Sequence, residues 1–241
     1  MTYLHRLLLG LCFTLAATSV CHADDHDPWE GFNRAMFAFN DTTDRYLLKP
    51  VTLGYRKVTP QPVRQGVGNV FSNALEIRNV FNGLLQGKPG QAGKDTGRFL
   101  INTTLGVAGL FDVAQHMGLE KTDGEDFGQT LGVWGVSNGP YLVLPLLGPR
   151  TLRDTASIPV DWVTEPMSYA GHTRTTIEVR IVEAINTRSS LLAMEQDIGS
   201  DKYTLLREAY LQRREYLIND GQVEDTFGAG ADDDFGEFGD F

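Results

Sequence analysis

The segment FGQTLGVWGVSNGPYLVLPLLGP, residues 127–149, contains no charged residue in 23 positions. Such length and neutrality are typical of a helix that crosses a bilayer, which needs about 20 apolar residues. Pro140, Pro145 and Pro149 argue against that helix, because each removes a backbone donor and clashes with the preceding turn. Irregular backbone at membrane depth is tolerated only where protein buries it or where it lines a wet cavity. The segment is therefore either an apolar loop packed in a globular core or part of a membrane-embedded passage.

Residues 1–23 have the pattern of a secretory signal peptide. Arg6 supplies the positive charge, residues 7–17 form the apolar stretch, and the segment ends at Ala23, a small residue. The apolar stretch is too short to span a bilayer as a helix. We therefore expect export of the chain, with cleavage after Ala23.

Cys21 offers an alternative processing site, as the lipidated N-terminus of a lipoprotein. Thr18-Ser19-Val20, which precedes it, lacks the Leu and the Gly or Ala that usually stand before such a cysteine. The only other cysteine is Cys12. Cleavage after Ala23 would thus leave a mature protein without a disulfide, stabilised by core burial or by an external partner.

The bulk composition is that of a folded protein of one or two domains, with 241 residues, 41% hydrophobic and 22% charged. The formal net charge is −10, and no basic face suited to nucleic acid is evident. Residues 222–241 are acidic and glycine-rich and contain neither Lys nor Arg, which is typical of a disordered tail. We predict a signal peptide over 1–23, a helical domain over 24–221 and an acidic disordered tail over 222–241.

The first predicted helix follows Asp27-Pro28-Trp29-Glu30, with Asp27 as the N-cap and Glu30 closing a capping box. Lys49-Pro50 is expected to end it. Its aromatic-rich face suggests either core packing or a helix lying in a membrane interface. This face contains Trp29, Phe32, Met36, Phe39, Thr43 and Tyr46.

Three further helices are predicted from apolar spacing. The second begins at Pro62, is expected to be buried on more than one side and ends at Gly87 and Pro89. The third is marked by Ile177, Ile181, Ile185 and Leu192, and the fourth by Leu206, Tyr210 and Leu217, with its end at 219–221. Between the second and third helices the chain is glycine-rich, with Tyr141–Leu144 as a short possible strand. The predicted fold is all-α with a long irregular centre.

The sequence GVSNG at 135–139 matches the G-x-S-x-G motif of serine hydrolases, with Ser137 as the nucleophile. Asp154 or Asp161, and then His172, follow in the order that such a triad requires. The motif needs a preceding strand and a following helix, and the prolines after Ser137 exclude that helix. A serine hydrolase is thus the unfavoured alternative. Histidines are far apart and no H-E-x-x-H pair occurs, so neither a metal nor a cofactor is predicted.

Five longer segments carry more information than these short motifs. They are DPWEGFNRAMFAFND (27–41), PQPVRQGVGN (60–69), GRFLINTTLGVAGLFDVA (97–114), FGQTLGVWGVSNGPYLVLPLLGPRTLRD (127–154) and REAYLQR (207–213). In order and spacing they resemble the MlaA/VacJ family of bacterial outer-membrane phospholipid-asymmetry proteins. The resemblance extends from about Asp27 to Gly221.

The resemblance implies an all-helical ring that lies in the inner leaflet of the outer membrane around an amphipathic passage. Such proteins remove phospholipids misplaced in the outer leaflet and pass them to a soluble periplasmic carrier, an MlaC-like protein. Trimeric porins hold the ring in the membrane. No bond is made or broken, so the resemblance implies no enzyme activity, cofactor or catalytic residue. A purely structural porin-associated protein is the remaining alternative.

The resemblance also indicates candidate site residues. By position, Phe39 and Asn40 correspond to the family segment linked to control of the passage; their alternative roles are core packing and a helix-surface position. Gly135 and Gly139 are further candidates, because glycine at a passage wall lets a headgroup approach the backbone. Many family members are lipoproteins, which would assign lipidation to Cys21.

Overall fold

The computed structural model describes residues 27–169, 171, 173–192 and 201–222. Helices dominate these residues, together with one two-stranded antiparallel sheet. The elements in chain order are α2 (Glu30–Thr43), the π-helix η1 (Asp44–Leu48), α3 (Lys49–Val58), α4 (Gln61–Leu85), α5 (Pro89–Thr104), α6 (Val113–His116), α7 (Phe127–Val133), β1 (Tyr141–Leu144), β2 (Gly148–Thr151), α8 (Leu152–Thr164), the 3-10 helix η2 (Pro166–Tyr169), α9 (Thr173–Leu191) and α10 (Lys202–Ile218).

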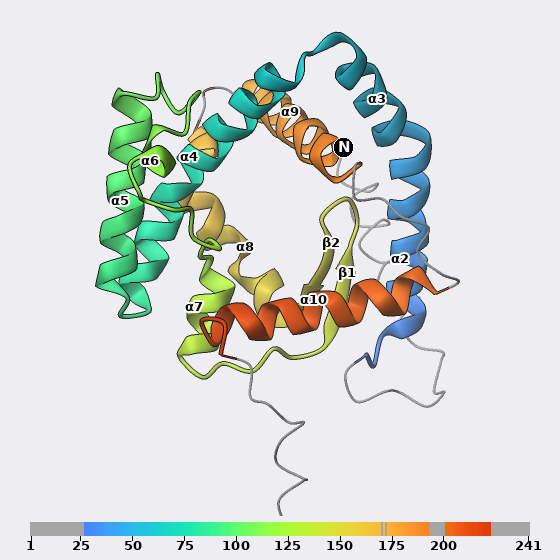
Figure 1. The fold of residues 1–241 in the computed structure, drawn as a ribbon. Helices are drawn as coiled ribbons and strands as arrows, with labels where there is room; N and C mark the ends of the chain where they lie inside the picture. The colour runs from blue at the N-terminus through green and yellow to red at the C-terminus, as the bar shows by residue number, and fades with distance from the viewer. Residues whose placement is uncertain (1–26, 170, 172, 193–200, 223–241) are drawn as a thin grey trace, which may run out of the picture.

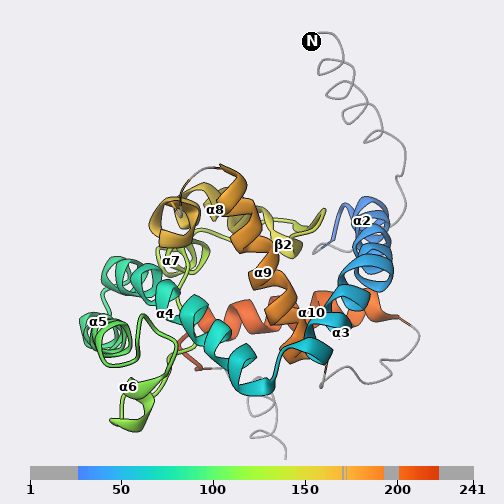
Figure 2. The ribbon, with the colours of Figure 1, turned by 90° about the horizontal axis from the view of Figure 1, so that it is seen from above.

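The elements follow one another around a central area that no ribbon crosses (Figure 1). Helices α2 and α3 run along one side, α4 and α5 along the opposite side, and α10 across the bottom of this view, while the β1–β2 hairpin extends inward. Seen after a 90° turn, α6 and α2 lie at opposite edges of the molecule (Figure 2). The predicted signal peptide and nearly all of the predicted acidic tail lie outside the described residues.

The predicted N-cap role of Asp27 is wrong. Helix α2 begins at Glu30, and its N-cap position is Trp29, which has no side-chain hydrogen bond to the helix. The Asp27 side chain is instead buried, 1% exposed, and accepts hydrogen bonds from Asn33 and Tyr203. A buried carboxylate requires hydrogen-bond partners. Asp27 finds them in tertiary contacts, and it therefore does not cap the helix as the local sequence pattern predicts.

The predicted helix end at Lys49-Pro50 is also wrong. The helix continues through the π-helix η1 into α3, where Pro50 occupies the first turn. The Lys49 amide donates to the carbonyl of Asp44, five residues earlier. This widened turn lets the chain continue past a proline that would clash with a regular α-turn.

The ends of the second predicted helix are confirmed. Helix α4 spans Gln61–Leu85 with proline in its first turn. Gly87, with φ +74°, follows its C-terminus, and the Lys88 amide bonds to the carbonyl of Gly83 at 2.8 Å. This left-handed glycine with a six-to-one hydrogen bond is a common helix termination.

The predicted long irregular centre is wrong in part. Helix α5 starts directly at Pro89, and α8 forms at Leu152–Thr164 although it contains Pro159. The glycines of this segment made α5 look irregular in the sequence. Where α4 meets α5, a Cβ on Gly83 would lie at an ordinary contact distance, 3.6 Å, from the Cβ of Ala92. The short strand suggested for Tyr141–Leu144 is confirmed as β1.

The burial pattern is the reverse of the one that the apolar stripes predict. Five hydrophobic residues are buried among those described, compared with twenty-one polar or charged residues. In α4 the buried positions include Asn73, Glu76, Asn79 and Asn82, while Phe81 and Leu84 are 41% and 59% exposed. The burial predicted for the apolar surface of α4 is therefore wrong at these positions.

The aromatic face of α2 shows the same inversion. Trp29 is 43% exposed, Phe32 51% and Phe39 49%, and Tyr46 in η1 is 75% exposed. Core packing is thus the wrong interpretation for this stripe, apart from Met36, which packs against the small core. That core consists of Tyr141, Val143 and Tyr203, with Met36, Phe37, Tyr210 and Leu211 against it.

A buried ionic network joins α4, α5 and the segment after α5. Arg98, 1% exposed, donates from Nε to Glu76 at 2.9 Å and from Nη2 to Asp112 at 2.9 Å. Asn102 holds the other oxygen of Asp112 and the amide of Ala114. These contacts satisfy charges that would be costly if left unpaired in a protein interior.

Replacing Arg98 by Met should lower the free energy of unfolding by about 3–5 kcal/mol, because Glu76 is then left buried without its cation. Denaturant unfolding of the detergent-purified protein measures this change. Arg174→Met is the matched control: its ion pair with Glu178 is exposed, and its loss should cost below about 1 kcal/mol. Equal effects of the two substitutions would contradict the network's structural role.

Asp95 should make stability depend on pH. Burial, and secondly the charge of Glu76, raise its pKa to about 6, whereas the unfolded value is about 3.9. The folded state therefore binds more protons between these values, and stability should fall by up to about 3 kcal/mol as pH rises from about 4 to above 6. Asp95→Asn should remove this part of the pH dependence in denaturant titrations, and parallel profiles would refute the assignment.

Candidate functional site

The neutral segment 127–149 forms α7, an irregular loop, β1 and the turn into β2. Strand β1 pairs with β2 in the register Tyr141↔Thr151, Leu142↔Arg150, Val143↔Pro149 and Leu144↔Gly148. Pro140 precedes β1, Pro145 lies in the turn, and Pro149 lies within the short strand β2, so none of the three is placed inside a helix. The segment combines a packed strand with exposed positions, so neither simple alternative from the sequence describes all of it.

Asn33 attaches the hairpin to α2. Its Nδ2 donates to the carbonyl of Tyr141 at 3.0 Å, and its Oδ1 accepts from the amide of Val143 at 2.8 Å. The same Nδ2 donates to Asp27 at 2.7 Å. One buried amide side chain therefore acts on β1 as a neighbouring strand would, satisfying both backbone groups.

Asn40 makes an equivalent contact at the tip of the hairpin. Its Nδ2 donates to the carbonyl of Leu144 at 2.9 Å, and its Oδ1 accepts from the amide of Leu146 at 2.8 Å. Leu146 has φ +63°, an uncommon conformation for a residue with a side chain. Asn40 is therefore more than a helix-surface residue, because it holds a strained turn.

Phe39, the neighbouring candidate, has its side chain half-exposed. The predicted role of Phe39 in core packing is wrong. Asn33 was missed at the sequence level, although a signal exists: Asn33 and Asn40 are seven residues apart and so lie on the same helical face. Two amides that flank an aromatic stripe are a feature that periodicity of apolar residues alone does not reveal.

Gly135 and Gly139 lie in the loop between α7 and β1. Both have positive φ, +87° and +63°, which explains glycine at these positions without reference to a ligand. A Cβ on Gly135 would meet nothing within 4 Å, whereas one on Gly139 would lie 3.1 Å from the Cβ of Leu152. Gly135 therefore borders open space, and Gly139 packs against the start of α8.

The base of the hairpin is held by a second ionic network. Asp154, 1% exposed, accepts from Arg214 at 2.9 Å and from Tyr210 at 2.6 Å. Arg214 also bonds both oxygens of Asp126, at 2.6 and 2.9 Å. Burial alone would raise the pKa of Asp126. The hydrogen bonds and charge of Arg214 have the larger opposite effect and lower the pKa of Asp126 to about 2. The network links the N-termini of α7 and α8 to α10.

The surroundings of Ser137 differ from a hydrolase elbow. Helix α7 precedes Ser137 and strand β1 follows it, the reverse of the strand-to-helix order that the motif needs. Asp154 is engaged by Arg214 and Tyr210, and Asp161 accepts from the amide of Phe127 at 2.8 Å. His172 lies outside the described residues.

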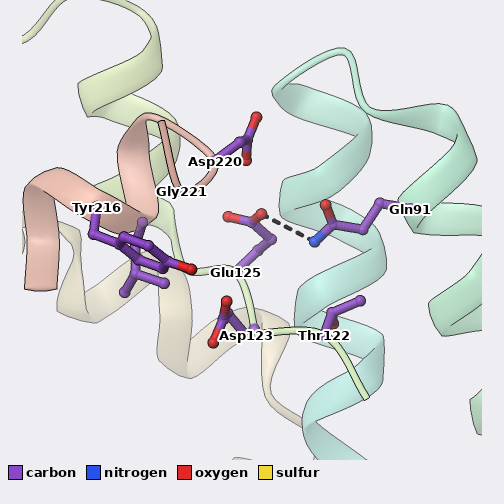
Figure 3. Close-up of a pocket in the computed structure, with 9 residues that line it drawn as sticks. Gln91, Thr122, Asp123, Glu125, Tyr216, Asp220 and Gly221 are labelled. Carbon is purple, nitrogen blue, oxygen red and sulfur yellow. Dashed lines mark hydrogen bonds between the residues drawn. The ribbon is translucent and has the colours of Figure 1, made fainter. Parts of the chain in front are cut away.

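A cavity of about 260 Å³ lies away from the hairpin, between the loop before α7, the start of α5 and the end of α10 (Figure 3). Asp123, Glu125 and Asp220 contribute carboxylates to its lining, and Gln91 donates to Glu125 at 3.0 Å. Lys88 pairs with Glu125 and Asp220, and Arg213 pairs with Asp123, so three carboxylates face two cations at this cavity. Among the described residues no group of His, Cys, Asp or Glu is placed to hold a metal ion.

These features define a class: a mostly helical protein that exposes apolar side chains, buries polar networks and supports a neutral hairpin. The family described as "MlaA lipoprotein" matches residues 25–217. The chain belongs to this family.

Several relatives carry the name "Intermembrane phospholipid transport system lipoprotein MlaA". The one from Escherichia coli K12 is 39% identical over 210 residues, covering 82% of this chain and 80% of the relative. The one from Haemophilus influenzae is 31% identical over 238 residues, covering 91% and 93%. A solved structure from work on "maintenance of bacterial outer membrane lipid asymmetry" superposes with a TM-score of 0.73 at 39% identity, covering 80% of this chain and 99% of that one.

Asn40→Ala should loosen the hairpin turn. It removes two hydrogen bonds, each worth about 1 kcal/mol, and so we expect at least about tenfold faster amide exchange at residues 144–148. Hydrogen–deuterium exchange with mass spectrometry measures this rate. Phe39→Leu is the control, because it leaves both Asn40 contacts intact. Unchanged exchange in Asn40→Ala would show that other contacts hold the turn.

Proposed function

We propose that this protein takes part in intermembrane phospholipid transport and maintains the lipid asymmetry of the outer membrane. The observation that carries the proposal is the inverted burial pattern, with apolar side chains outside and polar networks inside. Contiguous apolar surface on a protein marks an interaction with membrane or protein. The names of the relatives support the same activity.

Seating in one leaflet of the outer membrane is supported by exposed aromatic side chains. Trp29, Phe32 and Tyr46 expose aromatic rings, which are favoured at membrane interfaces. Across the described residues, no helix combines the length and the apolarity that a bilayer crossing requires. A ring of helices lying within one leaflet is consistent with both observations, because it presents apolar sides without spanning.

The central area bordered by the hairpin is the proposed passage. A phospholipid in transit needs polar surface for its headgroup and apolar surface for its tails. The uncharged segment 127–149 offers exposed backbone near Gly135 beside apolar side chains. Asn40, with Phe39 beside it, would set the position of the hairpin at this passage, and Gly139 would fix the loop at the start of α8.

The proposed direction is removal of phospholipid from the outer leaflet and delivery to a soluble periplasmic carrier, an MlaC-like protein. Trimeric porins would hold the ring at the periplasmic side of the outer membrane. The protein would act without catalysis. The proposed organisation is a signal peptide over 1–23, a helical domain over 24–221 and an acidic tail over 222–241, with Cys21 as the site of lipidation if cleavage does not occur after Ala23.

Ser137 provides a test that separates the candidate functions. It is exposed and lies between Gly135 and Gly139, without the positive φ that would strain a new side chain there. In a bacterial strain lacking its own family member, Ser137→Asp should let phospholipid accumulate in the outer leaflet, because a carboxylate repels the phosphate group. Ser137→Ala should behave as wild type, since a passage needs no nucleophile.

The measurement is the amount of outer-leaflet phospholipid, with protein level and porin association determined in parallel. Loss of activity in Ser137→Ala would indicate the hydrolase. A wild-type chain that reaches the outer membrane and binds porin but leaves asymmetry unrestored would indicate a structural porin-associated protein. Quantitative release of the protein by carbonate washing would contradict seating in the membrane.

A further inference from the structure

Arg150 is the only charged residue between Asp126 and Arg153. It lies on β2, opposite Leu142 of β1. Residues directly opposite each other in an antiparallel pair share a face of the sheet. Tyr141, Val143 and Thr151 are buried on the other face, against the core formed with α2 and α10.

Arg150 and Leu142 therefore occupy the face of the hairpin that this core does not cover. Both residues are half-buried. The hairpin extends into the central area of the molecule (Figure 1). Arg150 thus places a single positive charge on a hairpin that borders the proposed passage.

The guanidinium of Arg150 makes no hydrogen bond or ion pair within the part of the chain that the structure describes, and its charge acts on the nearby hydroxyl of Tyr210. Its Nε is buried without a hydrogen bond. The guanidinium groups of the nearby Arg153 and Arg214 both bond Asp154, although the Nε of Arg214 is also buried without a hydrogen bond. A buried donor left without an acceptor carries a free-energy cost, so an acceptor that enters with a ligand would be favoured at this position.

The chemistry of the missing partner follows from the donor. A guanidinium presents its N–H groups in a planar fork that matches the oxygens of a phosphate. The adjacent segment 127–149 supplies no carboxylate that would compete for the fork. We propose that Arg150 binds the phosphate diester of a phospholipid as the headgroup passes the hairpin. This proposal rests on the proposed function, and it assigns the first polar contact of the lipid within the passage.

A single cation is suited to transport. A transport route must bind its cargo strongly enough to admit it and weakly enough to release it. A contact between one guanidinium and the phosphate, beside an uncharged segment, meets this requirement. A cluster of several arginines would instead retain the lipid. The acidic cavity of Figure 3 offers no comparable site, because its lining carries three carboxylates.

The test is binding of a fluorescent phosphatidylethanolamine to the full-length protein in detergent. Arg150→Gln should weaken this binding about tenfold or more, the effect expected for loss of a charged hydrogen-bonding partner. Arg150→Lys should retain part of the affinity, because the charge remains and the fork is lost. Binding of the matching diacylglycerol, which lacks phosphate, should be the same in all variants.

Arg56→Gln is the matched control. Arg56 on α3 is a half-buried arginine without a hydrogen bond or ion pair from its guanidinium to the described residues, and its loss should leave phospholipid binding unchanged. Inorganic phosphate should compete only weakly, since it lacks the acyl chains. Competition at the affinity of the lipid would identify a free-anion site and overturn the proposal.

The outcomes also separate this proposal from the proposed function. Arg150→Gln that binds phospholipid as tightly as wild type would overturn the role of Arg150, while the Ser137→Asp result would still support the passage. A wild-type protein that binds no phospholipid would overturn both. Reduced binding in Arg150→Gln, with an unchanged unfolding midpoint and unchanged diacylglycerol binding, would support the assignment.

Discussion

The fold depends on hydrogen-bond satisfaction of polar side chains that lie inside the molecule. Few hydrophobic residues are buried, and the interior contacts between helices are made by asparagines, carboxylates and arginines. Each of these groups is costly to bury unless it is paired. The networks around Arg98 and Arg214 therefore do the work that an apolar core does in most globular proteins, and they fix which helix faces meet. Such contacts are directional, so they also define a specific geometry.

These polar contacts also hold the β1–β2 hairpin in place. Asn33 and Asn40 bond the backbone of β1 and its turn from one side, and the Asp154 network holds the start of α8 from the other. The hairpin itself is short, and an isolated two-stranded sheet is only marginally stable in water. Its position is thus set by side chains on helices that are distant in sequence. A structure held in this way can place a neutral loop and one arginine beside a central area without burying either.

The exposed apolar surface completes the argument. The protein exposes apolar side chains such as Phe32, Tyr46 and Ile181. It would tend to aggregate in water unless lipid or another protein covered them. The same inversion that removes apolar residues from the interior leaves polar groups to line it. A protein with this distribution is suited to a membrane, because it offers apolar contact to lipid while its own polar groups are paired inside.

The sequence by itself determined the helical character, the termini of α4 and the termination of α10, because capping and left-handed glycines are local. Its motifs also indicated the family, and through the family they indicated Asn40 as a candidate site residue. It did not determine which face of each helix is buried: spacing of apolar residues is the same whether a stripe meets a core or a membrane. Only the tertiary structure showed that Asn33, Asp27 and Glu76 lie inside and that the helix passes Pro50. It also showed that Arg150 makes no side-chain hydrogen bond to the residues that the structure describes. These features depend on contacts between residues far apart in the chain, and burial of a polar group is decided by the partner it finds there.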